Sequence, residues 1–138
     1  MNRPRVILAD DYQPAHEIYR KLLESDVDLI ATVSDGDAAV EAAKAHAPDL
    51  MLLDIEMGAM NGFSVARWLK KHMPGMKIVF LTMHAEPTYM SEAAAIGVDG
   101  YVIKRNAVTE LLQTVQSVLA GRTHFPPPDG AALVCKRT

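Results

Sequence analysis

The 138-residue chain lacks the features that mark disulfide-stabilised, zinc-binding and membrane-spanning proteins. Its single cysteine, Cys135, cannot form a disulfide within the chain, and no cluster of cysteine and histidine has the spacing of a zinc site. No apolar run approaches the roughly 18 residues that cross a bilayer, and the N-terminal segment lacks the long apolar core of a signal peptide. These absences predict a cytoplasmic protein from a reducing compartment, with no membrane partner.

An excess of one charge and several well-known motifs are also missing. The 14 Lys and Arg residues and 17 Asp and Glu residues give a net charge of −3, which disfavours a nucleic-acid-binding surface spread over the whole domain. The chain has no Gly-x-x-x-x-Gly-Lys-Ser/Thr loop and no Gly-x-Gly-x-x-Gly motif, which disfavours the nucleotide-binding folds that use them. The absence of Gly-x-Ser-x-Gly disfavours a serine hydrolase.

What the chain does have is a regular alternation of two hydrophobic patterns. Segments with helical spacing separate five short apolar runs, and several runs are apolar throughout, as strands buried on both faces of a parallel sheet are. The expected strands are residues 5–9, 29–33, 50–53, 77–81 and 100–103, and the expected helices are residues 13–24, 36–47, 62–72, 87–96 and 107–120. Strict alternation of five strands and five helices predicts a doubly wound α/β fold with a five-stranded parallel sheet.

Capping residues and a proline-rich segment mark the ends of these elements. The expected helix caps are Asp35, Asn61 and Asn106 at N-termini and Gly97 and Gly121 at C-termini. After the last glycine, "RTHFPPPDG" contains three consecutive prolines and predicts a stiff, extended linker. We therefore expect one domain over residues 1–121 and a proline-rich linker and tail over residues 122–138.

Polar side chains follow four of the expected strands at the points where these end. They are Asp10 and Asp11, Asp54, Thr82 and Lys104. Because functional groups in a doubly wound sheet gather beyond the carboxyl ends of its strands, we expect these three carboxylates, the hydroxyl and the ammonium group to lie together. Taken singly, an Asp pair can be a helix cap, a Thr a turn residue and a Lys a solvated side chain. The prediction therefore depends on all five lying at one edge.

Clustered carboxylates raise one another's pKa unless a cation joins them. Hard oxygen ligands at a partly open site suit Mg²⁺, which keeps several waters and accepts one or two carboxylates together with phosphate oxygens. One carboxylate could then attack phosphorus as a nucleophile. Phosphoryl transfer needs mainly positioning and neutralisation of the charged oxygens, which a metal ion, a Lys and a hydroxyl can supply.

From about residue 4 to residue 121, the chain resembles the receiver domain of bacterial response regulators. The motifs that carry the resemblance are "ILADDY" (7–12), "LLDIEMGAMNG" (52–62), "IVFLTM" (78–83) and "GYVIK" (100–104). The resemblance implies a flavodoxin-like three-layer α/β/α sandwich with strand order 2-1-3-4-5, an order that members of this family share.

The resemblance also implies a metal site and a phosphoacceptor. Asp54 matches the residue that forms the acyl phosphate. Asp11 and Asp54 match direct Mg²⁺ ligands, with the backbone carbonyl of Glu56 as a third. Asp10 matches a residue that contacts the Mg²⁺ ion through a water molecule or orients the other site residues.

Three further positions match a switch. Thr82 matches the hydroxyl that binds a phosphoryl oxygen, and Lys104 matches the lysine that contacts the phosphoacceptor and then the phosphate. Tyr101 matches the aromatic residue that turns inward in step with the threonine. Such a domain catalyses only its own phosphorylation and dephosphorylation and is otherwise not an enzyme.

The resemblance implies particular partners. The phosphoryl donor would be a phosphohistidine of a sensor histidine kinase, and phosphorylation would change the face built from the fourth helix, fifth strand and fifth helix. That face, or the first and fifth helices, would form a homodimer. Residues 100–125 resemble the branch whose receivers precede a LuxR-type helix-turn-helix domain and control transcription. In proteins of that branch, nucleic acid would be bound only through the output domain. We expect this output domain to be absent from the present chain.

The sequence departs from the family pattern after the phosphoacceptor and after the lysine. Gly58 and Arg105 stand where the family often has proline, and the glycine predicts a looser loop. Glu56 and His84 occupy positions that could control water access to an acyl phosphate and so its lifetime. An equally good interpretation is that both are exposed loop residues.

Two other functions are compatible with the same cluster. A Mg²⁺-dependent phosphatase would use an Asp nucleophile with Glu56 as its acid or base, but the chain offers no segment for a substrate-covering cap. A flavin-binding module would place a phosphate at this edge of the sheet, but the acidic cluster would repel it without a cation.

Overall fold

A five-stranded parallel sheet forms the centre of the molecule in this computed structural model, which describes residues 3–127. Its strands lie in the order β2-β1-β3-β6-β7. They are β1 (Arg5–Ala9), β2 (Asp28–Val33), β3 (Leu50–Leu53), β6 (Lys77–Thr82) and β7 (Gly100–Ile103). All four pairings are parallel. The predicted sheet and its 2-1-3-4-5 order are therefore confirmed.

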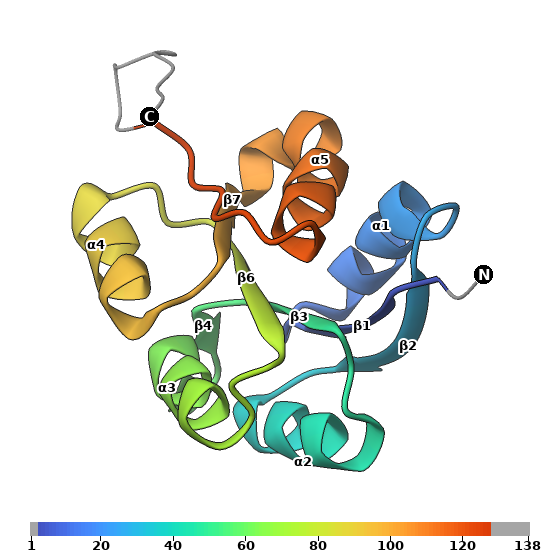
Figure 1. The fold of residues 1–138 in the computed structure, drawn as a ribbon, viewed down its shortest axis with the longest axis horizontal. Coiled ribbons are helices and arrows are strands. Elements are labelled where there is room, and N and C mark those ends of the chain that lie inside the picture. The colour runs from blue at the N-terminus through green and yellow to red at the C-terminus, as the bar shows by residue number, and fades with distance from the viewer. Residues whose placement is uncertain (1–2, 128–138) are drawn as a thin grey trace.

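Helices cover both faces of the sheet and make three layers (Figure 1). They are α1 (Gln13–Leu23), α2 (Gly36–His46), α3 (Gly62–His72), α4 (Pro87–Ile96) and α5 (Ala107–Leu119). Helices α1 and α5 lie on one side, and α2, α3 and α4 lie on the other. Each expected helix is present, within one residue of its predicted ends.

Two apolar cores hold the layers together because alternate residues of each strand point to opposite faces. In β1, Ile7 and Ala9 face α2, α3 and α4, whereas Val6 and Leu8 face α1 and α5. All four side chains are almost completely buried. The continuous apolar runs of the sequence thus reflect strands covered on both faces.

The structure adds elements that strict alternation did not predict. A two-stranded antiparallel hairpin, β4 (Glu56–Met57) and β5 (Met60–Asn61), follows β3, and a short 3₁₀ helix, η1 (Lys104–Asn106), precedes α5. Gly58 has φ +60° in the hairpin turn, a conformation that glycine adopts without strain. The residue expected to loosen this loop thus lies in the tight turn of a hairpin.

The predicted helix caps lie at the ends of their helices, but one of the N-terminal caps makes no side-chain capping bond. Asp35 and Asn61 each accept a hydrogen bond from a backbone N–H in the first turn of their helix, and Gly97 ends α4 in the left-handed conformation. Asn106 precedes α5, but its side chain makes no capping bond. Its backbone belongs to η1, and its carbonyl accepts a bond from the hydroxyl of Thr109 instead.

The chain leaves α5 through Gly121, at φ +97°, and then returns to the open edge of the sheet. His124 forms a parallel bridge with Gly100 of β7. Part of the predicted linker thus pairs with the sheet, while the rest of the predicted tail, from residue 128 and including Cys135, lies outside the described residues. Within residues 3–127, no helix is long and apolar enough to span a bilayer.

Candidate functional site

The polar residues predicted to gather at one edge of the sheet do so. Asp10 and Asp11 follow β1, Asp54 follows β3, Thr82 ends β6, and Lys104 follows β7. Carboxylate oxygens of Asp10, Asp11 and Asp54 all lie within 4.8 Å of one another. Parallel strands bring these distant parts of the chain together because all of them end on the same side.

Lys104 lies between two buried carboxylates. Its Nζ is 2.7 Å from Asp10 Oδ2 and 3.0 Å from Asp54 Oδ2. Asp10 is almost fully buried, and its other oxygen accepts a hydrogen bond from the backbone N–H of Tyr12. Asp54 also accepts from the backbone N–H of Glu56, at 3.4 Å. Asp10 therefore contacts the lysine directly in this structure and helps to hold its ammonium group beside Asp54.

The single positive charge of Lys104 faces the carboxylates of both Asp10 and Asp54, so the site has more negative than positive charge. Burial raises the pKa of Asp54 above its ordinary value, the bond to Lys104 opposes this rise, and the charge of Asp10 adds to it. For Lys104, burial alone would lower the pKa, but the bonds to Asp10 and Asp54 outweigh burial and raise it. The Lys104 ammonium group is thus strongly held by its two acidic neighbours, whereas for Asp54 the single lysine does not outweigh the effect of burial.

The arrangement fits a divalent cation. Asp11 is exposed, whereas Asp10 and Asp54 are buried, so the cluster opens to solvent on one side. Several oxygen ligands at an open position are what Mg²⁺ accepts, because it retains part of its water shell. The shortage of positive charge around Asp54 provides the electrostatic reason for a cation to bind there.

Thr82, which is fully buried, is connected to Tyr101 through the chain that follows β6. The backbone N–H of His84 lies 3.4 Å from Thr82 Oγ1 and donates to it. The hydroxyl of Tyr101 donates to the carbonyl oxygen of His84 at 2.8 Å. The Tyr101 ring therefore points inward in this structure, with 1% of its surface exposed.

His84 is held by acidic and aromatic neighbours. Its Nε2 lies 3.0 Å from Glu56 Oε2 and its Nδ1 lies 3.4 Å from Glu86 Oε1. The imidazole stacks on Tyr89, with ring centres 4.2 Å apart and planes 9° apart. The Glu56 side chain is largely exposed, but the His84 side chain is not. The two residues therefore lie beside each other at the entrance to the acidic cluster.

A cavity of about 570 Å³ opens over the site and has an apolar side. Ile18 and Met83 line it, with 54% and 73% of their surfaces exposed. Tyr19 also lines it and was missed as a site residue, because at its position in α1 it reads as part of the apolar stripe. Burial raises the pKa of the Tyr19 hydroxyl, and Lys104 opposes the rise. Only its neighbours in space mark it as a site residue.

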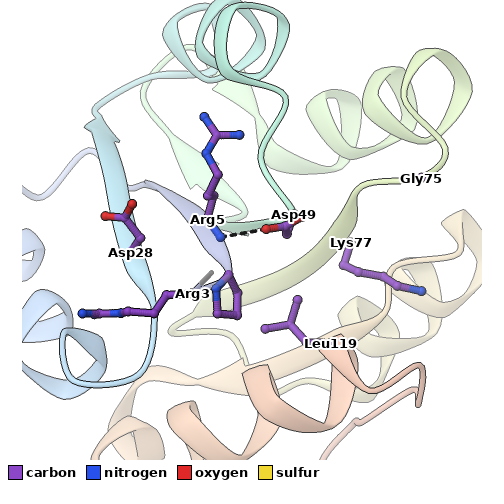
Figure 2. Close-up of a pocket in the computed structure, with 8 residues that line it drawn as sticks. Arg3, Arg5, Asp28, Asp49, Gly75, Lys77 and Leu119 are labelled. Carbon is purple, nitrogen blue, oxygen red and sulfur yellow. Dashed lines mark hydrogen bonds between the residues drawn. The ribbon is translucent and has the colours of Figure 1, made fainter. Parts of the chain in front are cut away.

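A larger hollow of about 950 Å³ lies at the opposite ends of the strands (Figure 2). Its arginines have structural partners: Arg3 donates to the carbonyls of Glu24 and Val27, and the guanidinium of Arg5 donates to two carbonyls at the end of α2. Basic side chains often donate hydrogen bonds to the free carbonyl groups at the C-terminal ends of helices. This hollow therefore does not compete with the acidic cluster as a candidate site.

Comparison with known proteins gives one consistent result. The sequence matches the response regulator receiver domain over residues 6–116. It is 32% identical to the probable transcriptional regulatory protein NarL of Mycobacterium tuberculosis over 125 residues, covering 89% of this chain and 58% of that protein. It is 33% identical to the transcriptional regulatory protein DesR of Bacillus subtilis over 124 residues, covering 88% of this chain and 61% of that protein. The chain thus spans a little over half the length of these relatives.

Solved structures agree with the sequence matches. The structure of a LuxR-family two-component response regulator from Aurantimonas superimposes with a TM-score of 0.85 at 27% identity, covering 89% of each chain. The signal receiver domain of the putative response regulator NarL from Mycobacterium tuberculosis gives a TM-score of 0.83 at 30% identity, covering 88% of this chain and all of that one.

Proposed function

The chain belongs to the response regulator receiver domain family, and from this premise we propose that it is a phosphoacceptor switch in which Asp54 takes a phosphoryl group from a sensor histidine kinase. The observation that carries the proposal is the placing of Asp54. Its carboxylate is held by Lys104, shares an acidic cluster with Asp10 and Asp11, and lines an open cavity.

The transfer is a displacement at phosphorus. An oxygen of the Asp54 carboxylate forms the new bond to phosphorus as the bond between phosphorus and the donor's imidazole nitrogen breaks. That nitrogen leaves with the electron pair and then takes up a proton. Positioning and charge neutralisation suffice for such a transfer, which fits a site whose side chains are already fixed by hydrogen bonds.

Each neighbour has a proposed part in the transfer. Asp11, Asp54 and the carbonyl of Glu56 would hold Mg²⁺, and Asp10 would act on it through water. The ion would neutralise charge on the phosphoryl oxygens. Lys104 would move its bond from Asp54 toward the phosphate. The Thr82 hydroxyl lies at the end of the neighbouring strand and would donate to a phosphoryl oxygen.

The output follows from the contacts of Tyr101. A Thr82 side chain drawn toward the phosphate would pull on the chain at His84, to which the Tyr101 hydroxyl is bonded. The face of α4, β7 and α5 would change and form a homodimer, with α1 and α5 as another possible surface. Moving such a switch from mostly off to mostly on takes about 5.5 kcal/mol of differential stabilisation.

The relatives are transcriptional regulators, and we extend this role to the present chain as a proposal. Residues 1–121 would act as the receiver, and any contact with nucleic acid would be made by a separate output domain. Residues 122–138 would lead from the receiver toward that output. A cytoplasmic location follows, because the proposed kinase donor acts there.

Incubation with acetyl phosphate tests the proposal directly. Intact-mass analysis should show one added phosphoryl group in the presence of Mg²⁺ and none when the ion is chelated. The Asp54→Asn variant should gain no mass, while Asp49→Asn, at the opposite end of the sheet, should react like the parent. Turnover of a generic phosphatase substrate without a stable adduct would favour the phosphatase alternative instead.

The pairing of Glu56 with His84 supports a second, narrower proposal. The two side chains stand at the entrance of the site, so they would govern how water reaches the acyl phosphate and therefore how long it lasts. The Glu56→Gln/His84→Ala double variant should change the rate of dephosphorylation. An unchanged rate would show that the pair has no such part.

A further inference from the structure

Residues 122–127, here called the edge strap, run back from the end of α5 to the open edge of β7. The turn is fixed by Gly121 and by a hydrogen bond from the backbone N–H of Arg122 to the carbonyl of Ser117. His124 then donates its backbone N–H to the carbonyl of Asp99, at 2.9 Å. The carbonyl of His124 accepts from the backbone N–H of Tyr101, at 3.0 Å.

The strap is limited to this one pairing step by its own sequence. In a parallel ladder, backbone groups on one side of a strand recur every second residue, so the next donor along the strap would be residue 126. That residue is Pro126, which has no N–H to give. The pairing therefore ends beside Tyr101 and does not extend along β7.

Phe125 covers the ring of Tyr101. The two ring centres are 5.8 Å apart with planes at 29°. Phe80 meets the same tyrosine edge-on at 6.2 Å, so the ring has an aromatic neighbour from the sheet and another from the strap. Stacking on the inward ring stabilises the inward position relative to any position in which the ring leaves this contact.

The inward ring is connected to the phosphoacceptor by contacts already described. The Tyr101 hydroxyl holds the carbonyl of His84, and the N–H of His84 contacts the Thr82 hydroxyl. The His84 imidazole contacts Glu56, whose backbone N–H contacts Asp54. A short series of contacts, part of it hydrogen bonds, thus runs from the strap to the carboxylate proposed to receive phosphate.

We infer that Phe125 is a positioning residue of the phosphorylation site, which acts through Tyr101 to favour the inward, phosphate-accepting arrangement. The inference rests on the proposed function of Asp54. The strap would then influence phosphorylation of the receiver, in addition to connecting the receiver to any following segment. By linkage, a strap that favours the phosphate-accepting arrangement must itself be held more firmly once the site is occupied.

The test compares strap variants under Mg²⁺ and acetyl phosphate, with intact mass as the readout. An aromatic pair typically contributes enough to change an equilibrium roughly two- to tenfold. Phe125→Ala should slow phosphorylation and weaken the binding of beryllofluoride, a phosphoryl mimic, by that factor. Phe125→Tyr keeps the ring and should behave like the parent, as should Thr123→Ala, whose side chain is exposed in the same strap.

A second variant and a reciprocal measurement separate positioning from general stability. His124→Pro removes the N–H bond to the carbonyl of Asp99 while keeping the Phe125 side chain, and it should change beryllofluoride affinity in the same direction at temperatures well below unfolding. Hydrogen exchange at the His124 amide should slow when beryllofluoride is added to the parent. If the parent is phosphorylated and Phe125→Ala matches it in rate and affinity, the inference fails while the proposed function stands. A parent that takes up no phosphoryl group overturns both.

Discussion

Replacing Lys104 by methionine should make the protein markedly less stable at neutral pH without divalent cations. The substitution keeps an unbranched side chain of similar length but removes the ammonium group that contacts two buried carboxylates. Hydrogen bonds to charged partners contribute about 1.5–3 kcal/mol each, and the open side of the cavity lets water recover part of that loss. We expect the free energy of unfolding to fall by about 2–4 kcal/mol.

The assay is urea unfolding of parent and variant in the presence of a chelator. Lys71→Met provides a matched control, because Lys71 is exposed on α3 and its replacement should change stability by less than about 0.5 kcal/mol. Adding Asp10→Asn to Lys104→Met should recover much of the loss, since it removes one of the two uncompensated charges. Equal unfolding midpoints for parent and Lys104→Met would refute the reasoning.

The pH dependence of this loss has a definite sign. The pKa of Lys104 is raised in the folded protein, so its contribution is complete below the ordinary lysine pKa and disappears as pH rises through the raised value. The pKa of Asp54 is also raised, so the folded state favours the protonated acid and tolerates it better than the ionised one. The difference between parent and variant should therefore be greatest near neutrality and shrink at both ends of the pH range.

Two further substitutions test the packing beside the site and a charged contact at the opposite end of the sheet. A Cβ at Gly62 would lie 2.7 Å from the Cα of Ile55 and also overlap the backbone of Asp54, so Gly62→Ala should cost about 1–3 kcal/mol in urea unfolding and slow the proposed phosphorylation as well. Asp99 accepts hydrogen bonds from Lys70 and from the backbone N–H of Ile78. Asp99→Asn should destabilise the protein by about 1–2 kcal/mol, and the loss should be smaller when Lys70→Met is already present.

The sequence predicts the sheet and the acidic cluster for a physical reason. In a parallel sheet the carboxyl ends of all strands lie at the same edge. Residues that follow those ends, as Asp10, Asp54 and Lys104 do, can therefore be placed together from the sequence, and so can Thr82 at the end of its strand. The hairpin of β4 and β5 could not be predicted this way. Its strands are two residues long, too short to show any alternation.

The structure also places near the site two residues that the sequence pattern did not identify as site residues. Tyr19 belongs to the apolar stripe of α1, and only its neighbours in space show that it lines the site. Phe125 lies next to three prolines, which suggested an extended segment without partners. An isolated bridge of one residue pair leaves no periodic signal in a sequence, so the contact with Tyr101 is visible only in three dimensions.

Two glycines pack closely against the hairpin after β3 and its junction with α3, and a side chain at either position would overlap its neighbours. Gly36, at the start of α2, lies directly against Met60, and Gly62 lies against the backbone of Asp54. Residues 56–61 are thus a poor place to insert a reporter, an affinity tag or a longer loop, although loop tips are usually the most permissive parts of a chain. New segments are better inserted where the chain does not pack against the backbone of Asp54.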